Sequence, residues 1–291
     1  MSASSRGLIM NIQQLRNATL LVEHGRHRIL VDPMLAAKGT LPPLRVFGAR
    51  QRNPIVELPA SAATALESVT HCLITHCQKG HFDHLDRAGK RWLRERQIPV
   101  ICTPRDAPYL AERGLNAQPL PARHAQPSPF LGGTLRTVPC VHGRGLAGRF
   151  MEHGVGYLIE WPDAPSLYLA GDTVLTPAVR DFVREHQPDI SVVPAGGARF
   201  DLGGDIIMGI EEVIAFAGLS SGWVIANHLE AISHCPVTRD ALRAAARKAG
   251  VDDRLLVPAD GETLTFGTAP VRQHHDARES PRAGCLEGST E

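Results

Sequence analysis

The alternation of apolar runs and amphipathic segments is the feature that most constrains the fold of this chain. In the first half, β-branched and apolar runs such as TLLVEHGRHRILV (residues 19–31) and HCLIT (71–75) are typical of strands. From SLYLA (166–170) onward, strands alternate with helical segments up to the strand TLTF (263–266). Strand-rich runs followed by β/α alternation, twice over, predict an α/β fold in which helices pack on both sides of a sheet sandwich.

Helical patterns are expected in five segments, which are 86–96, 104–113, 176–187, 206–219 and 236–250. In the fourth segment, Asp205 and Met208 are expected to serve as the cap and a core residue of the helix start. The alternation shows no break before residue 268, so one domain is expected over residues 1–267. From 268 to 291 the composition turns to Arg, His, Ser, Gly and Glu, which predicts a disordered tail.

The charge balance and the cysteine content argue against several classes of function. Formal net charge is +1, from 31 basic and 30 acidic residues, so neither nucleic acid nor an anionic membrane is an expected partner. No apolar run approaches the roughly 20 residues that span a bilayer, and Met1 to Gly7 lack the apolar core of a secretory signal. Six scattered cysteines without such a signal favour reduced thiols. We therefore expect a cytoplasmic protein whose partner is a small-molecule substrate, with its oligomeric state left open.

The decapeptide THCQKGHFDH (75–84) concentrates residues of the kinds that bind metals. His81, Asp83 and His84 fall within four positions, and the 14 histidines of the chain are a high number for 291 residues. Borderline divalent metals such as zinc prefer imidazole and carboxylate ligands, and catalytic sites leave one position open for water. A surface loop that happens to be rich in histidine is the alternative interpretation of this segment taken alone.

Further candidate ligands follow other predicted strands. His142 ends the run TVPCVH, Asp172 follows LYLAG, and His228 ends WVIANH. A single histidine after a strand is most often structural. Successive strand ends that each supply such a residue are instead typical of a site built from loops at the edge of a sheet. These positions together predict a metal site.

The order of these motifs resembles the metallo-β-lactamase superfamily. Asp32 comes first, His81-x-Asp83-His84 follows, and His142, Asp172 and His228 come later, so that the resemblance covers about residues 10–266. The segments LRNATLLVEHGRHRILVDPML, LYLAGDT, PDISVVPAGGARF and ANHLEAISHCPVTR are similar to the small bacterial metal-dependent hydrolases of that superfamily. The resemblance implies a four-layer αββα sandwich with one or two metal ions at the edge of the sheets.

The resemblance also implies a role for each candidate ligand. It assigns His81 and His142 to a first metal and gives a second metal three ligands of its own, namely Asp83, His84 and His228. Asp172 would bridge the two ions, and Asp32 would shape the site from a buried position without binding metal. Zinc is the expected cofactor, with one or two ions per chain, and iron or manganese is compatible with the same ligands.

The spacing of the first histidines departs from the family pattern Thr-His-x-His-x-Asp-His. Here Lys79 stands two positions before His81, and the histidine that follows Thr75 is His76. In one interpretation three residues are inserted, and His76 remains the first ligand while Gly80 provides the flexible point of a bulged loop. In the other, His76 is structural and the charge of Lys79 leaves one metal, held by Asp83, His84, Asp172 and His228. We expect the first arrangement, in which His76 is a metal ligand.

Three residues near the ligands are candidates for contact with the substrate. Glu230 and His234 follow His228 closely in the segment HLEAISH, and Arg149 lies in a glycine-rich loop after His142. An arginine at that position would suit an anionic substrate. Local hydrogen bonding within the loop, or a solvated arginine, is the alternative in each case.

Together these residues predict a metal-dependent hydrolase. A metal-bound hydroxide would attack an ester, lactone, amide or phosphodiester group, with Asp83 orienting the nucleophile and Asp172 holding the metals together. An iron-dependent oxidoreductase or dioxygenase on the same fold is an alternative, because ligand type does not separate iron from zinc. A nuclease is disfavoured by the short segment between Asp172 and His228. A non-catalytic metal- or ligand-binding protein with a degenerate first site around Lys79 is a further alternative.

Overall fold

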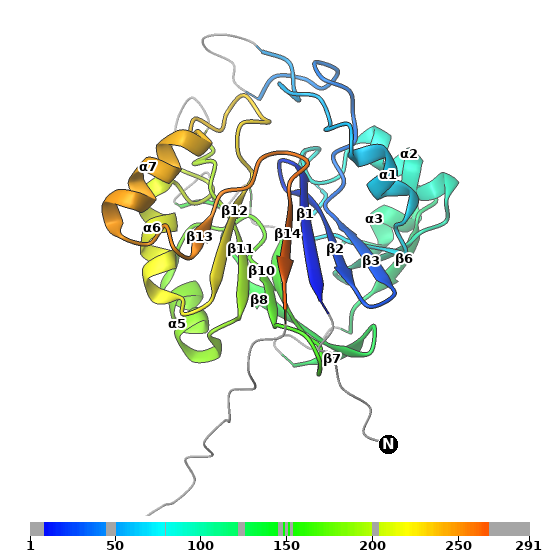
Figure 1. The fold of residues 1–291 in the computed structure, drawn as a ribbon. Helices are drawn as coiled ribbons and strands as arrows, with labels where there is room; N and C mark the ends of the chain where they lie inside the picture. The colour runs from blue at the N-terminus through cyan, green and yellow to red at the C-terminus, as the bar shows by residue number, and fades with distance from the viewer. Residues whose placement is uncertain are drawn as a thin grey trace, which may run out of the picture.

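Two seven-stranded sheets lie face to face, and helices cover their outer sides (Figure 1). The computed structural model describes residues 9–44, 51–78, 80–121, 126–144, 148, 151, 154–199 and 204–267. The predicted α/β class and the four-layer αββα sandwich are confirmed. The segment expected to be a disordered tail, 268–291, lies outside the described residues.

The first sheet has the strand order β14-β1-β2-β3-β4-β5-β6. Its strands are β1 (Met10–Arg16), β2 (Thr19–His24), β3 (His27–Val31), β4 (His71–Leu73), β5 (Pro99–Cys102), β6 (Asn116–Pro119) and β14 (Thr263–Phe266). The meander β1-β2-β3 is antiparallel, because each connection is a tight turn. Strands β3 to β6 are parallel to one another.

The second sheet has the order β13-β12-β11-β10-β9-β8-β7. Its strands are β7 (Ser128–Phe130), β8 (Gly133–Pro139), β9 (Val155–Glu160), β10 (Leu167–Leu169), β11 (Ile190–Pro194), β12 (Trp223–Asn227) and β13 (Leu255–Leu256). Strands β7 to β10 pair antiparallel, and β10 to β13 are parallel. Strands β8, β10 and β12 therefore point the same way, and their C-terminal ends lie at one edge of the sheet.

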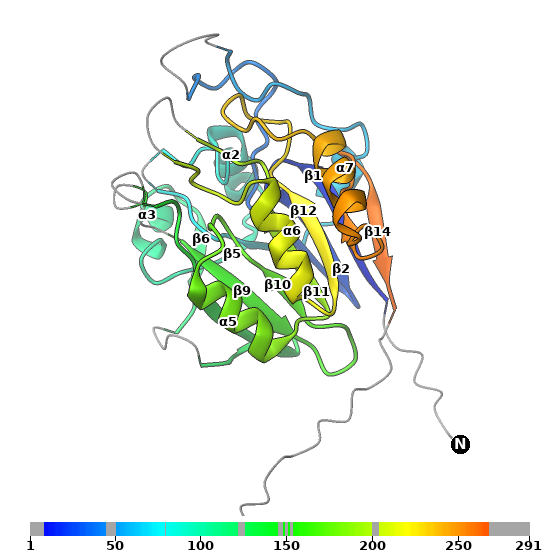
Figure 2. The same cartoon turned by 90° about the vertical axis from the view of Figure 1, so that its left-hand side faces the viewer.

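One group of helices covers each sheet. On the first sheet these are α1 (Ala62–Glu67), α2 (Arg87–Glu95) and α3 (Ala107–Ala111), and on the second they are α5 (Pro177–His186), α6 (Ile210–Leu219) and α7 (Arg239–Ala249). Figure 2 looks onto the second group, with α5, α6 and α7 in front of their sheet. No helix in the described part of the chain has the length and apolar character needed to cross a membrane.

Apolar side chains fill the spaces between the layers. Between the sheets, residues such as Ile12, Tyr157 and Ile225 form one buried cluster, because alternate side chains of both sheets point inward. A second cluster lies under α5, α6 and α7, and a third lies under α2 and α3. The packed sandwich provides a rigid support for polar loops at its edge.

The start of α6 differs from the prediction. Gly209 rather than Asp205 caps the helix, and the first helical residue is Ile210. Met208 is fully buried, as expected of a core residue, but its backbone is not helical. Its N–H donates to the Thr173 carbonyl, and its carbonyl accepts from Gly197 N–H. Tertiary hydrogen bonds therefore replace the first helical turn that the local pattern indicated.

Candidate metal centre

The predicted site residues lie in loops that begin where strands end. Asp32 follows β3, His76 follows β4, and the loops after β8, β10 and β12 carry His142, Asp172 and His228. The first two loops leave one sheet and the other three leave the second sheet. Residues from both sheets therefore meet at one edge of the sandwich.

A glycine shapes the loop that carries Asp172. Gly171 has φ of +63°, and a Cβ there would lie 2.8 Å from the Val155 carbonyl oxygen. A side chain would therefore meet both an unfavourable backbone conformation and a steric clash. This explains why glycine precedes Asp172 at the point where the chain leaves β10.

Three histidines form the first cluster of possible metal donors. One ring nitrogen each of His76, His81 and His142 lies within 4.8 Å of the others, and all three residues are buried. The ring centroids of His76 and His81 are 4.4 Å apart, and those of His81 and His142 are 5.1 Å apart. The structure thus brings His76 to the place that the insertion hypothesis gave it.

Gln78 and Gly80, between His76 and His81, have backbone features of a turn. Gly80 has φ of +89°, a left-handed conformation that favours glycine. The backbone N–H of His81 donates to the Gln78 carbonyl at 3.2 Å. Gln78 and Gly80 therefore lie between two histidines that both reach the cluster. Lys79, which the alternative interpretation placed at the metal, lies outside the described residues.

Oxygen atoms hold the Nδ1 atom of every histidine in this cluster. The Nδ1–H group of His81 donates to the Gln78 carbonyl, and that of His142 donates to the Ile206 carbonyl at 2.9 Å. His76 Nδ1 lies 2.9 Å from Thr75 Oγ1, whose own hydrogen is directed to Asp32. Each ring is therefore in the tautomer with the proton on Nδ1 and the lone pair on Nε2. This tautomer can bind a metal through Nε2.

The second cluster contains two carboxylates and two histidines. Donor atoms of Asp83, His84, Asp172 and His228 all lie within 4.8 Å of one another, and all four residues are buried. His228 Nε2 is 3.2 Å from Asp83 Oδ2, and His84 Nε2 is 3.1 Å from Asp172 Oδ2. His228 Nδ1 contacts the Cys235 sulfur at 3.5 Å. The structure thus places together four residues that were predicted to bind a second metal.

Asp172 is close to both clusters. Its Oδ2 atom lies 3.1 Å from His84 Nε2, 3.4 Å from His142 Nε2 and 3.5 Å from His228 Nε2. The distance from the same oxygen to His76 Nε2 is 3.9 Å. A single carboxylate oxygen therefore lies near histidines of both groups, as a bridging ligand would.

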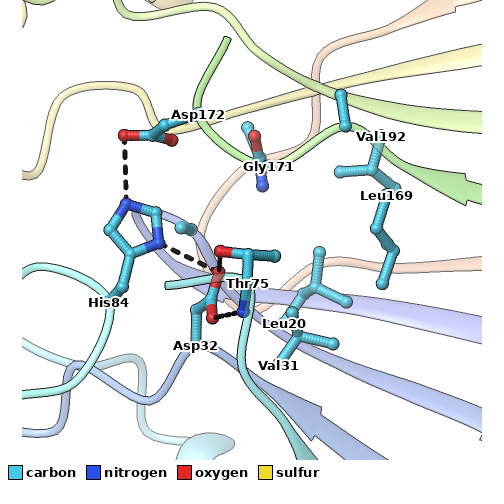
Figure 3. Close-up of a pocket in the computed structure, with 12 residues that line it drawn as sticks. Leu20, Val31, Asp32, Thr75, His84, Leu169, Gly171, Asp172 and Val192 are labelled. Atoms are coloured by element: carbon cyan, nitrogen blue, oxygen red, sulfur yellow. Dashed lines mark hydrogen bonds and ion pairs between the residues drawn. The ribbon is translucent and has the colours of Figure 1, made fainter. Parts of the chain in front are cut away.

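Asp32 lies behind the centre and fixes His84. Its Oδ2 accepts hydrogen bonds from His84 Nδ1 at 2.9 Å and from Thr75 Oγ1 at 2.6 Å, and its Oδ1 accepts from Thr75 N–H at 2.8 Å. Figure 3 shows His84 between Asp172 and Asp32. A cavity of about 20 Å³ beside these residues is also lined by Leu20 and other apolar side chains. This volume is roughly that needed by one water molecule.

Burial decides the protonation of two histidines in the first cluster. It lowers the pKa of His81 to about 4, and it also lowers the pKa of His142. Desolvation outweighs the opposing charge of Asp83 on His81 and of Asp172 on His142. The two imidazoles are therefore neutral at pH 7.

Charge partners decide the protonation of the second cluster. Burial alone would lower the pKa of His84 and of His228, but Asp172 and further partners raise both pKa values well above the usual range. Burial would raise the pKa of Asp83 and of Asp172, but His84 and His228 lower both. The carboxylates are therefore ionised and face cationic imidazoles.

The residues present fit a divalent metal. His81 Nε2 is buried and has no hydrogen-bond partner among the described residues, so its lone pair is available to a ligand. Cationic imidazoles gathered around two carboxylates mark places where a metal ion would replace protons. Imidazole and carboxylate donors of this kind suit zinc, iron or manganese.

The residues predicted to contact substrate have different environments. His234 is buried, and this burial lowers its pKa to about 4 although the charge of Asp83 opposes the change. Glu230 accepts hydrogen bonds from the Arg239 backbone at 3.1 Å and from its guanidinium at 2.7 Å. Arg149 lies outside the described residues. A role in substrate binding stays a prediction for all three.

Several contacts of the centre were not predicted from sequence. Thr75 bridges Asp32 and His76, Cys235 contacts His228, and Asn17 lies against the same histidine. Threonine, cysteine and asparagine are common in other roles, so their types alone carry no signal. The position of Thr75 directly before His76 is the one local indication that sequence offered.

Comparison with known proteins gives consistent matches over most of the chain. The family described as the beta-lactamase superfamily domain matches residues 27–249. The UPF0173 protein YddR of Bacillus subtilis is 35% identical over 265 residues, which cover 88% of this chain and 100% of that protein. A UPF0173 metal-dependent hydrolase of Agrobacterium fabrum is 25% identical, with 88% of this chain and 100% of that protein covered. The crystal structure of an isothiocyanate hydrolase from Delia radicum gut bacteria has a TM-score of 0.79 and 30% identity, covering 89% of this chain and 100% of that one.

Proposed function

We propose that this chain, which belongs to the beta-lactamase superfamily, is a two-metal hydrolase of small organic electrophiles. The resemblance inferred from the motifs is confirmed by the family match. The observation that carries the proposal is the meeting of the three-histidine cluster and the four-residue cluster at one carboxylate, Asp172. The family relationship and the donor geometry support the same class of chemistry.

In this proposal each cluster holds one divalent metal. His76, His81 and His142 would hold the first, while Asp83, His84 and His228 would hold the second, with Asp172 between them. Zinc is the metal that we propose, because imidazoles and carboxylates are its usual ligands in catalytic sites. When bound, the metals would lower the pKa of water to about 7 and polarise the oxygen that gains negative charge.

The side chains of the centre orient the reactants. The carboxylate of Asp83 is ionised and belongs to the second cluster, so it would accept a hydrogen bond from the attacking water and direct a lone pair toward the substrate. Asp32 accepts a hydrogen bond from His84 Nδ1 and thereby fixes the plane of that ring. The buried position of these groups excludes bulk water and strengthens their electrostatic effect.

Apolar side chains adjoin the centre and favour a neutral substrate. Ile206, Ile207 and Ile232 belong to one buried cluster, in which the Ile206 carbonyl accepts the His142 hydrogen bond. The same cluster includes Cys235, which contacts His228. An apolar substituent loses little on leaving water for such surroundings, whereas an ionised one loses much.

A small organic isothiocyanate is the substrate that we propose first. The supporting comparison is the isothiocyanate hydrolase, which this chain matches over that protein's whole length. Addition of one water to R–N=C=S and cleavage of the bond between nitrogen and the central carbon gives the amine R–NH₂ and carbonyl sulfide. That carbon is an electrophile like the carbonyl carbon of an ester, lactone or amide. These compounds form the second group of candidate substrates, and phosphodiesters, which are anionic, rank below them.

The test combines metal analysis with a substrate panel. Purified protein is analysed for zinc, iron and manganese, and is then assayed with benzyl and allyl isothiocyanates, esters, lactones and a phosphodiester. We expect close to two metals per chain and a turnover that a chelator abolishes and added zinc restores. Asp181→Ala, which removes an exposed carboxylate on α5, serves as the control. Protein that binds no metal, or metal-loaded protein that turns over none of the panel, would contradict the proposal.

A further inference from the structure

Asn17 occupies the turn between β1 and β2, beside the candidate centre. Its side chain is fully buried, and its backbone has φ of +56°, in the left-handed region. Asparagine tolerates this conformation better than most residues, because its short polar side chain can hydrogen-bond locally. The turn itself needs only the conformation, and glycine would provide that without burying an amide.

The contacts of Asn17 reach donor loops of both sheets. Its backbone carbonyl accepts from His228 N–H at 3.0 Å, on the loop after β12. Its side-chain Nδ2 donates to the Asp83 carbonyl at 3.3 Å, on the loop after β4, and lies 3.3 Å from His228 Nε2. One residue therefore links two loops that belong to opposite sheets and carry donors of the same cluster.

The amide oxygen of Asn17 is a further indication of function. Oδ1 is buried and has no hydrogen-bond partner among the described residues. A buried acceptor without a partner destabilises a fold, because the hydrogen bond that it made to water in the unfolded chain is not replaced. A residue that served the turn alone would carry this penalty without any benefit, so the amide requires another explanation.

We propose that Asn17 is a positioning residue for the second cluster, which contains Asp83, His84, Asp172 and His228. Its amide donates to the Asp83 carbonyl, and its backbone carbonyl accepts from His228 N–H, so the residue holds the Asp83 and His228 loops in the relative positions that a shared metal requires. This inference rests on the proposed function, because it concerns one of the two metals. It extends that function to a residue that is itself outside both donor clusters.

Three variants separate the side chain from the turn. Asn17→Gly removes the amide and keeps the left-handed backbone, together with the carbonyl that accepts from His228 N–H. Asn17→Asp keeps the shape of the side chain but cannot donate to the Asp83 carbonyl. Gln97→Gly is the matched control, because Gln97 also has a positive φ, at 51°, and its side chain donates to the Arg94 carbonyl at the surface.

Binding is measured on the full chain by cobalt(II) titration, followed by visible absorption, and by zinc competition with a chelator. Wild-type protein and Gln97→Gly should show the same two binding events. In Asn17→Gly the metal affinity of the three-histidine cluster should be unchanged. The metal affinity of the second cluster should fall about 10- to 100-fold, which is the usual effect of losing a group that orients a ligand. Asn17→Asp should weaken the same event, because the donor is lost. Titration of His76→Ala and His228→Ala assigns each event to its cluster.

Each other result overturns the inference. Wild-type affinity for both metals in Asn17→Gly would show that the side chain serves the turn alone, and the proposed function would stand. Tighter binding in Asn17→Asp would show that an oxygen at this position is a ligand and not a positioning group. Wild-type protein that binds no metal would overturn the proposed function together with this inference, so the two failures are distinguishable.

Discussion

The two donor clusters lie side by side but are organised in different ways. In the three-histidine cluster, uncharged oxygens hold the Nδ1 atoms, and burial keeps His81 and His142 neutral. In the second cluster, carboxylates face His84 and His228, whose pKa values they raise. One group depends on the shape of the surrounding backbone, and the other depends on paired charges.

This difference indicates which contacts each cluster requires. The first needs the Thr75 hydroxyl and the carbonyls of Gln78 and Ile206 to orient its three rings. The second needs its ionised carboxylates and the groups that orient its rings, because removing one partner leaves an uncompensated buried charge. Asp172 contacts histidines of both clusters and is the point at which they are coupled.

The largest effect is expected from Asp172→Ala. It removes the oxygen that lies near His84, His142 and His228, so both clusters should lose metal affinity by more than about 100-fold, and activity should fall with it. Metal content after dialysis and the hydrolase assay measure the two effects, with Asp181→Ala as the control. Full metal content in Asp172→Ala would mean that the clusters bind independently of it.

His228→Ala should break the second cluster alone. The variant removes the ring that faces Asp83 Oδ2 and leaves the three rings of the first cluster in place. We expect elemental analysis to show a loss of about one metal per chain. His186→Ala removes a ring that packs on Phe182 in α5 and should retain both metals. Loss of both metals in His228→Ala would show that the first cluster cannot hold a metal by itself.

His76→Ala should break the first cluster alone. The ring centroid of His76 lies 5.4 Å from that of His142, so its removal should release about one metal and leave the second cluster loaded. His71→Ala, which removes a half-buried histidine at the start of β4, should have no effect on metal content. Lys79→Ala should also spare both metals. Loss of metal with Lys79→Ala and its retention with His76→Ala would reverse our interpretation of the spacing.

Asp32→Asn should have a smaller and one-sided effect. The substitution replaces the carboxylate that accepts the hydrogen bond from His84 Nδ1 by a neutral amide. The hydrogen bonds of His81 and His142 are unchanged. We expect the affinity of the second cluster for zinc to fall about 10-fold, which competition with a chelator can measure. An equal loss at both clusters would mean that Asp32 acts on the whole edge of the sandwich, through Thr75 and His76.

The smallest effect is expected from deletion of residues 268–291. This segment lacks the apolar periodicity of the residues before it, so neither cluster should respond to its removal. Thermal unfolding and metal content of the shortened chain should match those of the full chain. A large decrease in melting temperature would show that the segment packs on the sandwich.

Much of the layered fold could be predicted because it depends on local patterns. Thr176 and Thr238 cap α5 and α7 within the segments expected to be helical, and each accepts a hydrogen bond from a backbone N–H three residues on. The predicted start of α6 was wrong, because Met208 exchanges hydrogen bonds with Thr173 and Gly197 instead of extending the helix. Local preference is a weak signal where a tertiary contact competes with it.

The sequence by itself determined the order of strands and helices and the donor residues at strand ends. These follow from side-chain periodicity and from ligand chemistry, which are properties of neighbouring residues. Only the tertiary structure decided that His76 joins His81 in spite of their spacing, that Asp172 lies between two clusters, and that Asn17 contacts His228. The contacts of Asp172 and the contact between Asn17 and His228 join residues on opposite sheets. The distances between the residues in all three cases depend on how the sheets pack and on the conformation of each loop.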